Sequence, residues 1–86
     1  MKVTKTHINT NTEVIRNGFS PDVTYRFQYE NFYFEANTTN KGIEVYDSET
    51  HKYDYDEPTA RYDKFHGNKP EFVNYVQDFL LNNNKV

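Results

Sequence analysis

The chain has 86 residues, enough for one domain, and 15 of them are Tyr or Phe while none is Cys. The absence of Cys excludes disulfides, thiolate zinc sites and cysteine nucleophiles. The formal net charge is −3, but residues 29–63 carry nine acidic and three basic side chains, a local charge of −6. This acidic segment argues against DNA or RNA as the main partner, because phosphate contacts need clustered Lys and Arg.

Residues 2–16 contain β-forming side chains on both sides of a polar stretch at 9–12, which predicts one or two short strands. Asn17-Gly18 is a turn signal, and Ser20-Pro21-Asp22 extends the break. The N-terminus has no apolar run typical of a signal peptide, and no segment approaches the ~18 apolar residues of a membrane helix. We therefore expect a cytoplasmic protein.

Residues 23–29 alternate between apolar and polar types, which places one set of side chains on a single strand face: Val23, Tyr25, Phe27 and Tyr29. Glu30-Asn31 then forms a tight connection to residues 32–36, which have a second apolar set on one face: Phe32, Phe34 and Ala36. Two alternating segments joined by so short a link predict a β-hairpin.

Two further strands are predicted after the hairpin. Residues 37–42 form a turn in which Gly42 is able to take a positive φ. Residues 43–46 form a strand, and residues 48–51 turn again. Residues 52–56 form the next strand, with Tyr53 and Tyr55 on one face and Asp54 and Asp56 on the other. Short links between successive strands predict a meander.

Pro58 is predicted to end the sheet, and residues 59–69 to form a loop. Asn68 is a suitable helix cap, and Pro70 fits the first helical turn, where its missing N–H has no cost. From Pro70 to about Asn82, apolar side chains recur at helical spacing: Phe72, Val73, Val76, Phe79 and Leu80. This stripe is expected to be buried on the sheet against Val23, Phe27, Phe34 or Val45.

These elements predict a single α+β domain covering residues 1–86. Its expected architecture is an antiparallel meander sheet of about four to five strands, packed by one C-terminal amphipathic helix. An aromatic ring can bury about 150–250 Å², so a few rings supply most of such a thin core.

The sequence offers no metal or cofactor site. Asp54-x-Asp56 beside His51 is similar to the start of a calcium loop, but Thr59 stands where that loop needs Gly and Phe65 where it needs Glu. We interpret these carboxylates as surface charge and expect no metal and no cofactor.

Catalytic motifs are also missing from the sequence. The two Ser residues, Ser20 and Ser48, lie in predicted turns, and the three Gly residues are isolated, which excludes a nucleophile elbow, a phosphate loop and a dinucleotide fingerprint. We therefore expect that the protein is not an enzyme.

The surplus of aromatic residues has three interpretations. The rings can pack the core, anchor a protein interface, where Tyr is enriched, or stack nucleic-acid bases. Single-strand binders pair aromatic residues with positive charge, whereas here Tyr alternates with Asp and Glu, as in Tyr53-Asp54-Tyr55-Asp56-Glu57. The acidic neighbours favour packing or a protein interface over direct nucleic-acid binding.

In its small size, acidity, Tyr and Asn content and lack of catalytic motifs, the chain is similar to small phage or mobile-element proteins that inhibit host machinery, of which anti-CRISPR proteins are one group. The likeness is one of composition and covers no alignable segment. It implies a non-enzymatic inhibitor, in the host cytoplasm if phage-encoded, that occupies a basic, nucleic-acid-binding groove of a larger protein.

The expected binding residues form an acidic, Tyr-rich face within residues 44–63: Glu44, Tyr46, Asp47, Glu49, Tyr53, Asp54, Tyr55, Asp56, Glu57, Tyr62 and Asp63. The alternatives are that these carboxylates only keep the surface solvated, or that the chain is an assembly module. An assembly module would form a homodimer through a sheet edge or an aromatic face. A third class, single-strand binding, would need Lys2, Lys5, Arg16 and Arg26 to gather beside exposed rings.

Overall fold

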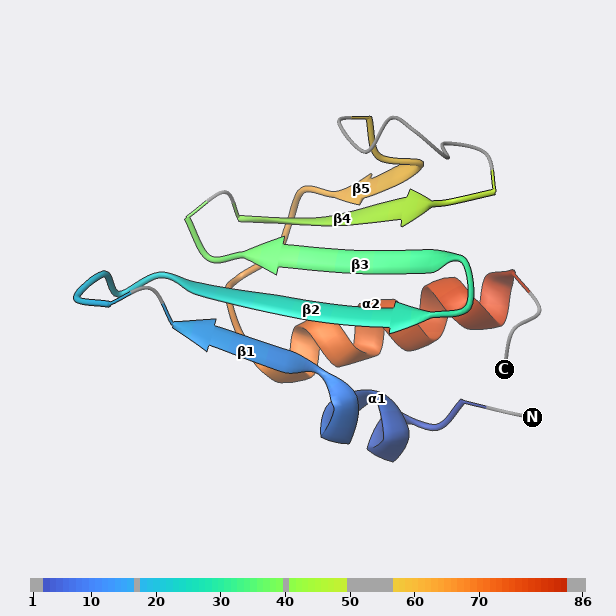
Figure 1. The fold of residues 1–86 in the computed structure, drawn as a ribbon, viewed down its shortest axis with the longest axis horizontal. Coiled ribbons are helices and arrows are strands. Elements are labelled where there is room, and N and C mark those ends of the chain that lie inside the picture. The colour runs from blue at the N-terminus through green and yellow to red at the C-terminus, as the bar shows by residue number, and fades with distance from the viewer. Residues whose placement is uncertain (1–2, 17, 40, 50–56, 84–86) are drawn as a thin grey trace.

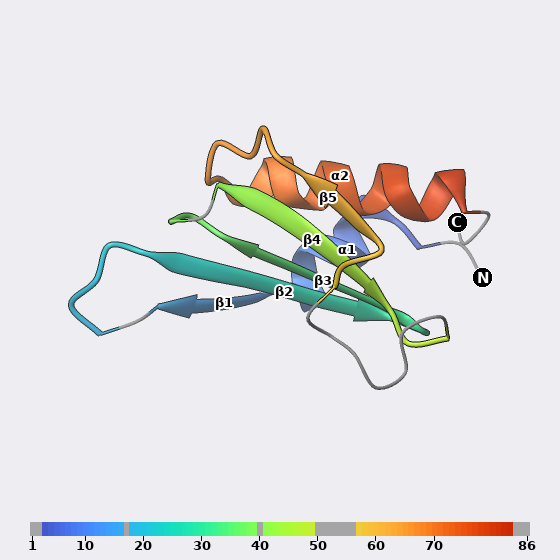
Figure 2. The ribbon, with the colours of Figure 1, turned by 90° about the horizontal axis from the view of Figure 1, so that it is seen from above.

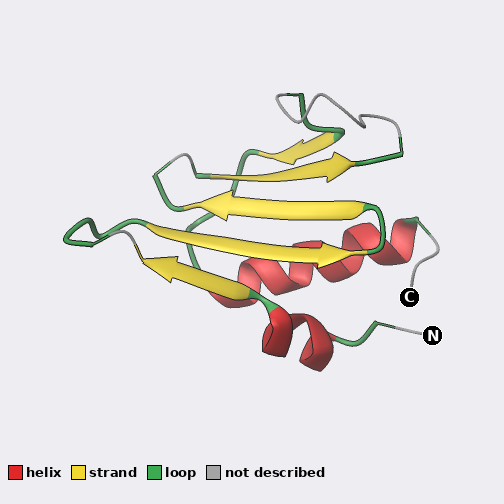
Figure 3. Ribbon diagram, viewed as in Figure 1, coloured by secondary structure: helices red, strands yellow, loops and turns green. Residues whose placement is uncertain are grey.

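The computed structural model of the protein describes residues 3–16, 18–39, 41–49 and 57–83. Within these residues, five strands form one antiparallel sheet in the order β1-β2-β3-β4-β5, which confirms the predicted meander and the α+β class (Figures 1 and 3). The strands and the two described helices are, in chain order, α1 Lys5–Asn11, β1 Glu13–Arg16, β2 Val23–Tyr29, β3 Phe32–Asn37, β4 Gly42–Asp47, β5 Ala60–Tyr62 and α2 Lys69–Asn82.

Both described helices lie on the same side of the sheet. Figure 2 shows α2 running across one face, which we call the inner face, with α1 on that side as well. The His7 ring of α1 contacts Phe27 of β2 edge-on, with ring centroids 6.1 Å apart. The opposite, outer face carries no helix from the described part of the chain.

The predicted hairpin is confirmed as β2 and β3. Phe27 lies opposite Phe34 and Tyr29 opposite Phe32, so the apolar sets of both strands share the inner face. Glu30 begins the connection with a φ of 53°, a left-handed conformation that closes the tight turn. The alternation of side chains along each strand therefore fixes which residues remain for the outer face.

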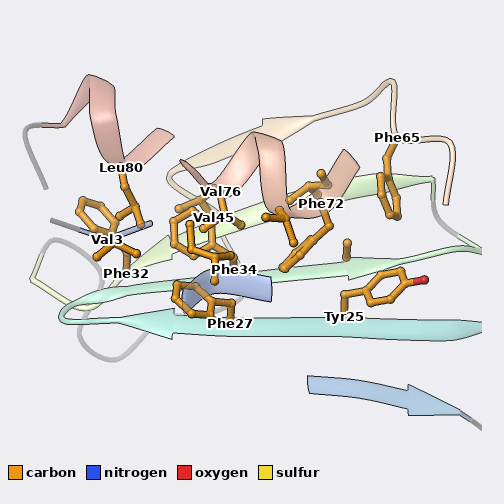
Figure 4. Packing of buried hydrophobic residues seen from close by; sticks show 14 of the residues in the cluster. Val3, Tyr25, Phe27, Phe32, Phe34, Val45, Phe65, Phe72, Val76 and Leu80 are labelled. Carbon is orange, nitrogen blue, oxygen red and sulfur yellow. The ribbon is translucent and has the colours of Figure 1, made fainter. Parts of the chain in front are cut away.

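The core lies between the inner face and α2 (Figure 4). Phe34 and Phe72 are its largest fully buried side chains. The predicted helix stripe is confirmed at four buried positions: Phe72, Val73, Val76 and Leu80. Phe79 packs against this cluster but is only half-buried, so the expectation that it is buried with the rest of the stripe is wrong. It lies at the margin of the helix–sheet contact, with its ring edge-on to Phe34 at 5.5 Å.

The start of α2 follows the prediction. The side chain of Asn68 accepts a hydrogen bond from the Glu71 N–H at 2.9 Å, and Pro70 lies in the first turn. This bond satisfies one of the N–H groups that a helix terminus leaves without an intrahelical acceptor.

The N-terminal segment is helical where strand was predicted. Residues 5–11 form α1, and β1 is the single strand that residues 13–16 supply. Thr4 caps the helix by accepting a hydrogen bond from the His7 N–H at 3.1 Å. Ile8 is fully buried in the core cluster. Tertiary burial of this side chain outweighs the weak β-preference of the neighbouring Thr residues.

The last described strand lies beyond Pro58, so the predictions that Pro58 ends the sheet and that 59–69 is loop are wrong over residues 60–62. Thr59 N–H donates to the Val45 carbonyl at 2.7 Å, which leads the chain into β5 beside β4. The strand predicted at 52–56 lies outside the described residues.

Gly42 has a different role from the predicted one. The left-handed residue of the β3–β4 turn is Lys41, with a φ of 52°, whereas Gly42 is a buried residue of β4. A Cβ at position 42 would lie 2.5 Å from Nη2 of Arg61. The guanidinium of the neighbouring strand therefore lies over the backbone at this point, and an alanine here would have to displace that flexible side chain.

Candidate binding face

A row of charged side chains crosses the outer face. The strand registers align one residue from each strand: Glu13 with Arg26, Arg26 with Glu35, Glu35 with Glu44, and Glu44 with Arg61. Each of these positions alternates with inward-facing residues along its own strand. The outer face of the central strands therefore presents two neighbouring carboxylates between two arginines.

Ion pairs hold the central carboxylates in place. Arg26 Nε donates to Glu35 Oε1 at 2.9 Å, and Arg61 Nη1 lies 3.4 Å from Glu44 Oε1 while Arg61 Nε also binds Asp63. These hydrogen bonds raise the pKa of both arginines, chiefly through Glu35 for Arg26 and through Asp63 for Arg61. With arginine side chains about 40% exposed, the pairs orient the carboxylates but add little stability.

Two tyrosines form a second row beside the charged one. Tyr33 of β3 lies directly opposite Tyr46 of β4, with ring centroids 6.1 Å apart and planes inclined by 46°. The Tyr33 hydroxyl donates to Glu35 Oε1 at 3.4 Å, and the Tyr46 hydroxyl donates to Glu44 Oε2 at 3.1 Å. Each ring is thus tied to a carboxylate two residues away on its own strand.

The pKa values of both tyrosines are raised, first by burial and then by the neighbouring carboxylates. Burial, the hydrogen bond to Glu44 and the charges of Glu44 and Glu35 raise the pKa of Tyr46 to about 12. Burial and the Glu35 charge also raise the pKa of Tyr33, against a smaller opposing effect of Arg26. Removing a phenolic proton beside two carboxylates is unfavourable, so both hydroxyls stay protonated at neutral pH.

A shallow hollow of about 380 Å³ lies beside these rings. We call it the tyrosine hollow, and its described lining is Gln28, Asn31, Tyr33, Glu35, Tyr46 and Ser48. At one end the Asn31 amide donates to Asp47 Oδ1 at 2.7 Å, and the Ser48 N–H donates to the Asn31 carbonyl at 2.9 Å. These bonds tie the β2–β3 turn to the end of β4 and give the hollow a fixed wall.

The structure brings part of the predicted face together. Glu44 and Tyr46 lie on the outer face, Asp47 ends β4, and Glu49 and Glu57 are exposed. Four of the predicted binding residues lie outside the described residues: Tyr53, Asp54, Tyr55 and Asp56.

The two predicted residues around the end of β5 separate from each other. Tyr62 lies on the inner side, where its ring stacks on Tyr75 of α2 at 5.2 Å. Asp63 is exposed and pairs with Arg61. Tyr62 is therefore part of the helix–sheet packing and does not share a face with Tyr46.

The prediction missed the contribution of β2 and β3 to this face. Arg26, Tyr33 and Glu35 are neighbours of Glu44 and Tyr46 in space but lie 9–20 residues earlier in the chain. The signal was present in the alternation of residues 32–36, since the strand that turns Phe32 and Phe34 inward must turn Tyr33 and Glu35 outward. Arg26 and Arg61 lie on either side of the carboxylate pair instead of gathering, which does not suit a phosphate backbone.

The described part of the chain contains no group of three His, Asp or Glu side chains that could hold a metal ion. Its two histidines lie away from the tyrosine hollow, His7 against Phe27 and His66 beside Glu71, so neither is a neighbour of the Ser48 hydroxyl. Neither described helix has the length and apolar character needed to cross a bilayer. Comparisons with protein-family models, curated proteins and solved structures gave no match.

Proposed function

We propose that the protein is a non-enzymatic binding protein whose outer face occupies a basic groove on a larger protein. The supporting observation is the pairing of Tyr33 and Tyr46 with Glu35 and Glu44 on the outer face of β3 and β4. Both described helices cover the inner face, which leaves this aromatic and acidic surface on the opposite side (Figure 2).

The proposal follows from what these groups do at interfaces. Carboxylates steer a cationic partner toward the face and fix its register. Tyrosine rings supply contact area with few rotatable bonds, which is why they recur as interface anchors. A nucleic-acid-binding enzyme of the host has a groove of the required charge, so the protein would act as an inhibitor that competes with nucleic acid. Such a role fits a phage or mobile-element protein acting in the host cytoplasm.

The experiment is affinity capture from the lysate of a low-GC bacterium, quantified by mass spectrometry. The test variant is Tyr33→Thr/Tyr46→Thr, which removes both rings but keeps β-forming side chains. The matched control is Leu81→Ser, which removes an exposed apolar side chain from α2. The wild type and the control should enrich the same basic protein, less at high salt, and the test variant should not. Equal capture by the test variant would refute the proposal.

A second candidate is an assembly module that dimerises through β1. This strand pairs with β2 alone among the described strands, and Val14 is 40% exposed on it. A free strand edge can pair with a second copy. Sedimentation of the purified protein tests this reading, which predicts a dimer whose stability depends little on salt; a monomer at high concentration would exclude it.

A further inference from the structure

The tyrosine hollow has the geometry of a site for a planar cation. A cation is attracted to an aromatic face within about 6 Å of the ring centroid. The Tyr33 and Tyr46 centroids are 6.1 Å apart, and the two rings are inclined to each other. One group placed over the cleft between them is therefore within reach of both rings.

The same hollow offers a carboxylate oxygen for a cationic donor. Within the described residues, Arg26 Nε and the Tyr33 hydroxyl both bind Oε1 of Glu35. Those contacts leave Oε2 of this hollow-lining residue as an acceptor for a further donor. A guanidinium carries five N–H donors in one plane, so it can lie on a ring and bind a carboxylate at the same time, which a compact ammonium does less well.

The second hollow of the molecule provides a comparison. It has a volume of about 420 Å³ and is lined by Tyr62, Tyr75, Glu71 and Asp78 among others. Its two rings stack on each other, and burial alone raises the pKa of Tyr75, with no contribution from a carboxylate. In the tyrosine hollow, burial is again the largest cause of the raised pKa of Tyr33 and of Tyr46, but neighbouring carboxylates add to it. Carboxylates thus act on both rings of the tyrosine hollow but not on Tyr75.

We infer that the tyrosine hollow receives the guanidinium of a single arginine side chain projecting from the partner. This inference rests on the proposed function, and it specifies the contact that anchors the outer face in the basic groove. The guanidinium lies against Tyr33 and Tyr46 and donates to Glu35. Arg26 binds the other oxygen of Glu35, and its positive charge repels the incoming guanidinium. This repulsion limits the affinity of the hollow for one guanidinium and excludes a further cation.

The test is a ¹⁵N NMR titration of the full chain with Nα-acetyl-arginine amide. The uncharged isostere Nα-acetyl-citrulline amide is the ligand control. Arginine amide should shift the amide signals of Tyr33, Glu35 and Tyr46, and citrulline amide should not. Tyr46→Leu should weaken binding by about two- to fivefold, the loss of one exposed cation–π contact, while Tyr46→Phe should bind like the wild type.

Charge variants give effects of opposite sign. Glu35→Gln should weaken arginine binding and Arg26→Gln should strengthen it, because the first removes the acceptor charge and the second the competing cation. Asp78→Asn, the same charge change on α2 in the second hollow, should have no effect. If the substitutions acted only by destabilising the fold, both Glu35→Gln and Arg26→Gln would weaken arginine binding.

The inference is overturned by equal shifts with citrulline amide, by shifts centred on Glu71 and Asp78, or by unchanged affinity in Tyr46→Leu. Shifts of the outer face by oligo-dT but not by arginine amide would also overturn it, in favour of base stacking. The two proposals fail separately. If the wild type binds arginine amide but captures no partner, the proposed function is refuted. If the wild type captures a partner but does not bind arginine amide, this inference alone is refuted.

Discussion

The two central phenylalanines of α2 should differ in their contribution to stability. Phe72 is fully buried, and its ring lies 5.8 Å from Tyr25. Truncation of a buried Phe to Ala costs about 3–5 kcal/mol. Phe79 is half-buried, so its truncation loses only part of that burial, together with edge-on contacts to Phe32 and Phe34 that are worth about 1–3 kcal/mol. Phe72→Ala should therefore lower the free energy of unfolding more than Phe79→Ala.

The assay is urea denaturation followed by far-UV circular dichroism. At about 0.05–0.15 kcal/mol per residue, a chain of 86 residues has a stability of about 4–13 kcal/mol, so Phe72→Ala removes a large fraction of it and unfolds the protein at the lower end of this range. Leu81→Ala, at an exposed position of the same helix, should change stability by less than about 0.5 kcal/mol. If Phe79→Ala were the more damaging variant, or Phe72→Ala cost under about 1 kcal/mol, the packing of α2 on the sheet would be described wrongly.

Three further predictions concern single contacts. The pKa of Tyr46 is raised from 10.0 to about 12 in the folded state, so the folded protein holds this phenolic proton more tightly than the unfolded chain does. The stability linked to the proton is complete below pH 10 and is lost as pH rises toward 12. Urea unfolding should therefore show a smaller loss of stability at alkaline pH for Tyr46→Phe. Gly42→Ala should displace Arg61 from Glu44 and lower the free energy of unfolding by less than about 1 kcal/mol. This loss should vanish when Arg61 is also replaced by Ala, and additive effects in the double-mutant cycle would contradict the prediction. Asn68→Ala should lower stability by about 1 kcal/mol through loss of the helix cap, and an unchanged melting temperature would contradict this.

Much of the fold could be predicted because local patterns and tertiary packing agree in the middle and end of the chain. Residues 23–36 alternate in polarity, and only one face of the two strands can bury their apolar side chains. In the same way, one helix face carries Phe72, Val76 and Leu80. Asn68 and Pro70 act locally, so their roles at the start of α2 follow from the sequence alone.

The errors occur where a distant contact decides the local structure. Residues 5–11 have weak preference for any state, and the burial of Ile8 in the core cluster selects the helix. The role of Gly42 depends on Arg61, which comes 19 positions later and lies over its backbone. Pairing with β4 makes residues 60–62 a strand, although their sequence is short and follows a proline.

The candidate site shows the same limit. Glu44 and Tyr46 could be recognised as an acidic, aromatic segment, but their partners on β3 are set by strand register. Register also places Arg26 and Arg61 at the ends of the carboxylate pair, which composition alone does not reveal. The result is a face on which a pair of carboxylates lies between two arginines beside the tyrosine hollow, whereas the acidic, Tyr-rich face expected within residues 44–63 drew on that segment alone.

The most direct measurement of the central claim is site-specific photocrosslinking in a bacterial lysate. A photoreactive amino acid at Ser48 lies in the wall of the tyrosine hollow, and one at Asn74 lies exposed on α2 as the matched control. Binding through the outer face predicts a covalent adduct with a larger basic protein from position 48, none from position 74, and a lower yield at high salt. Adducts from position 74 alone, or self-adducts alone from position 48, would contradict the account.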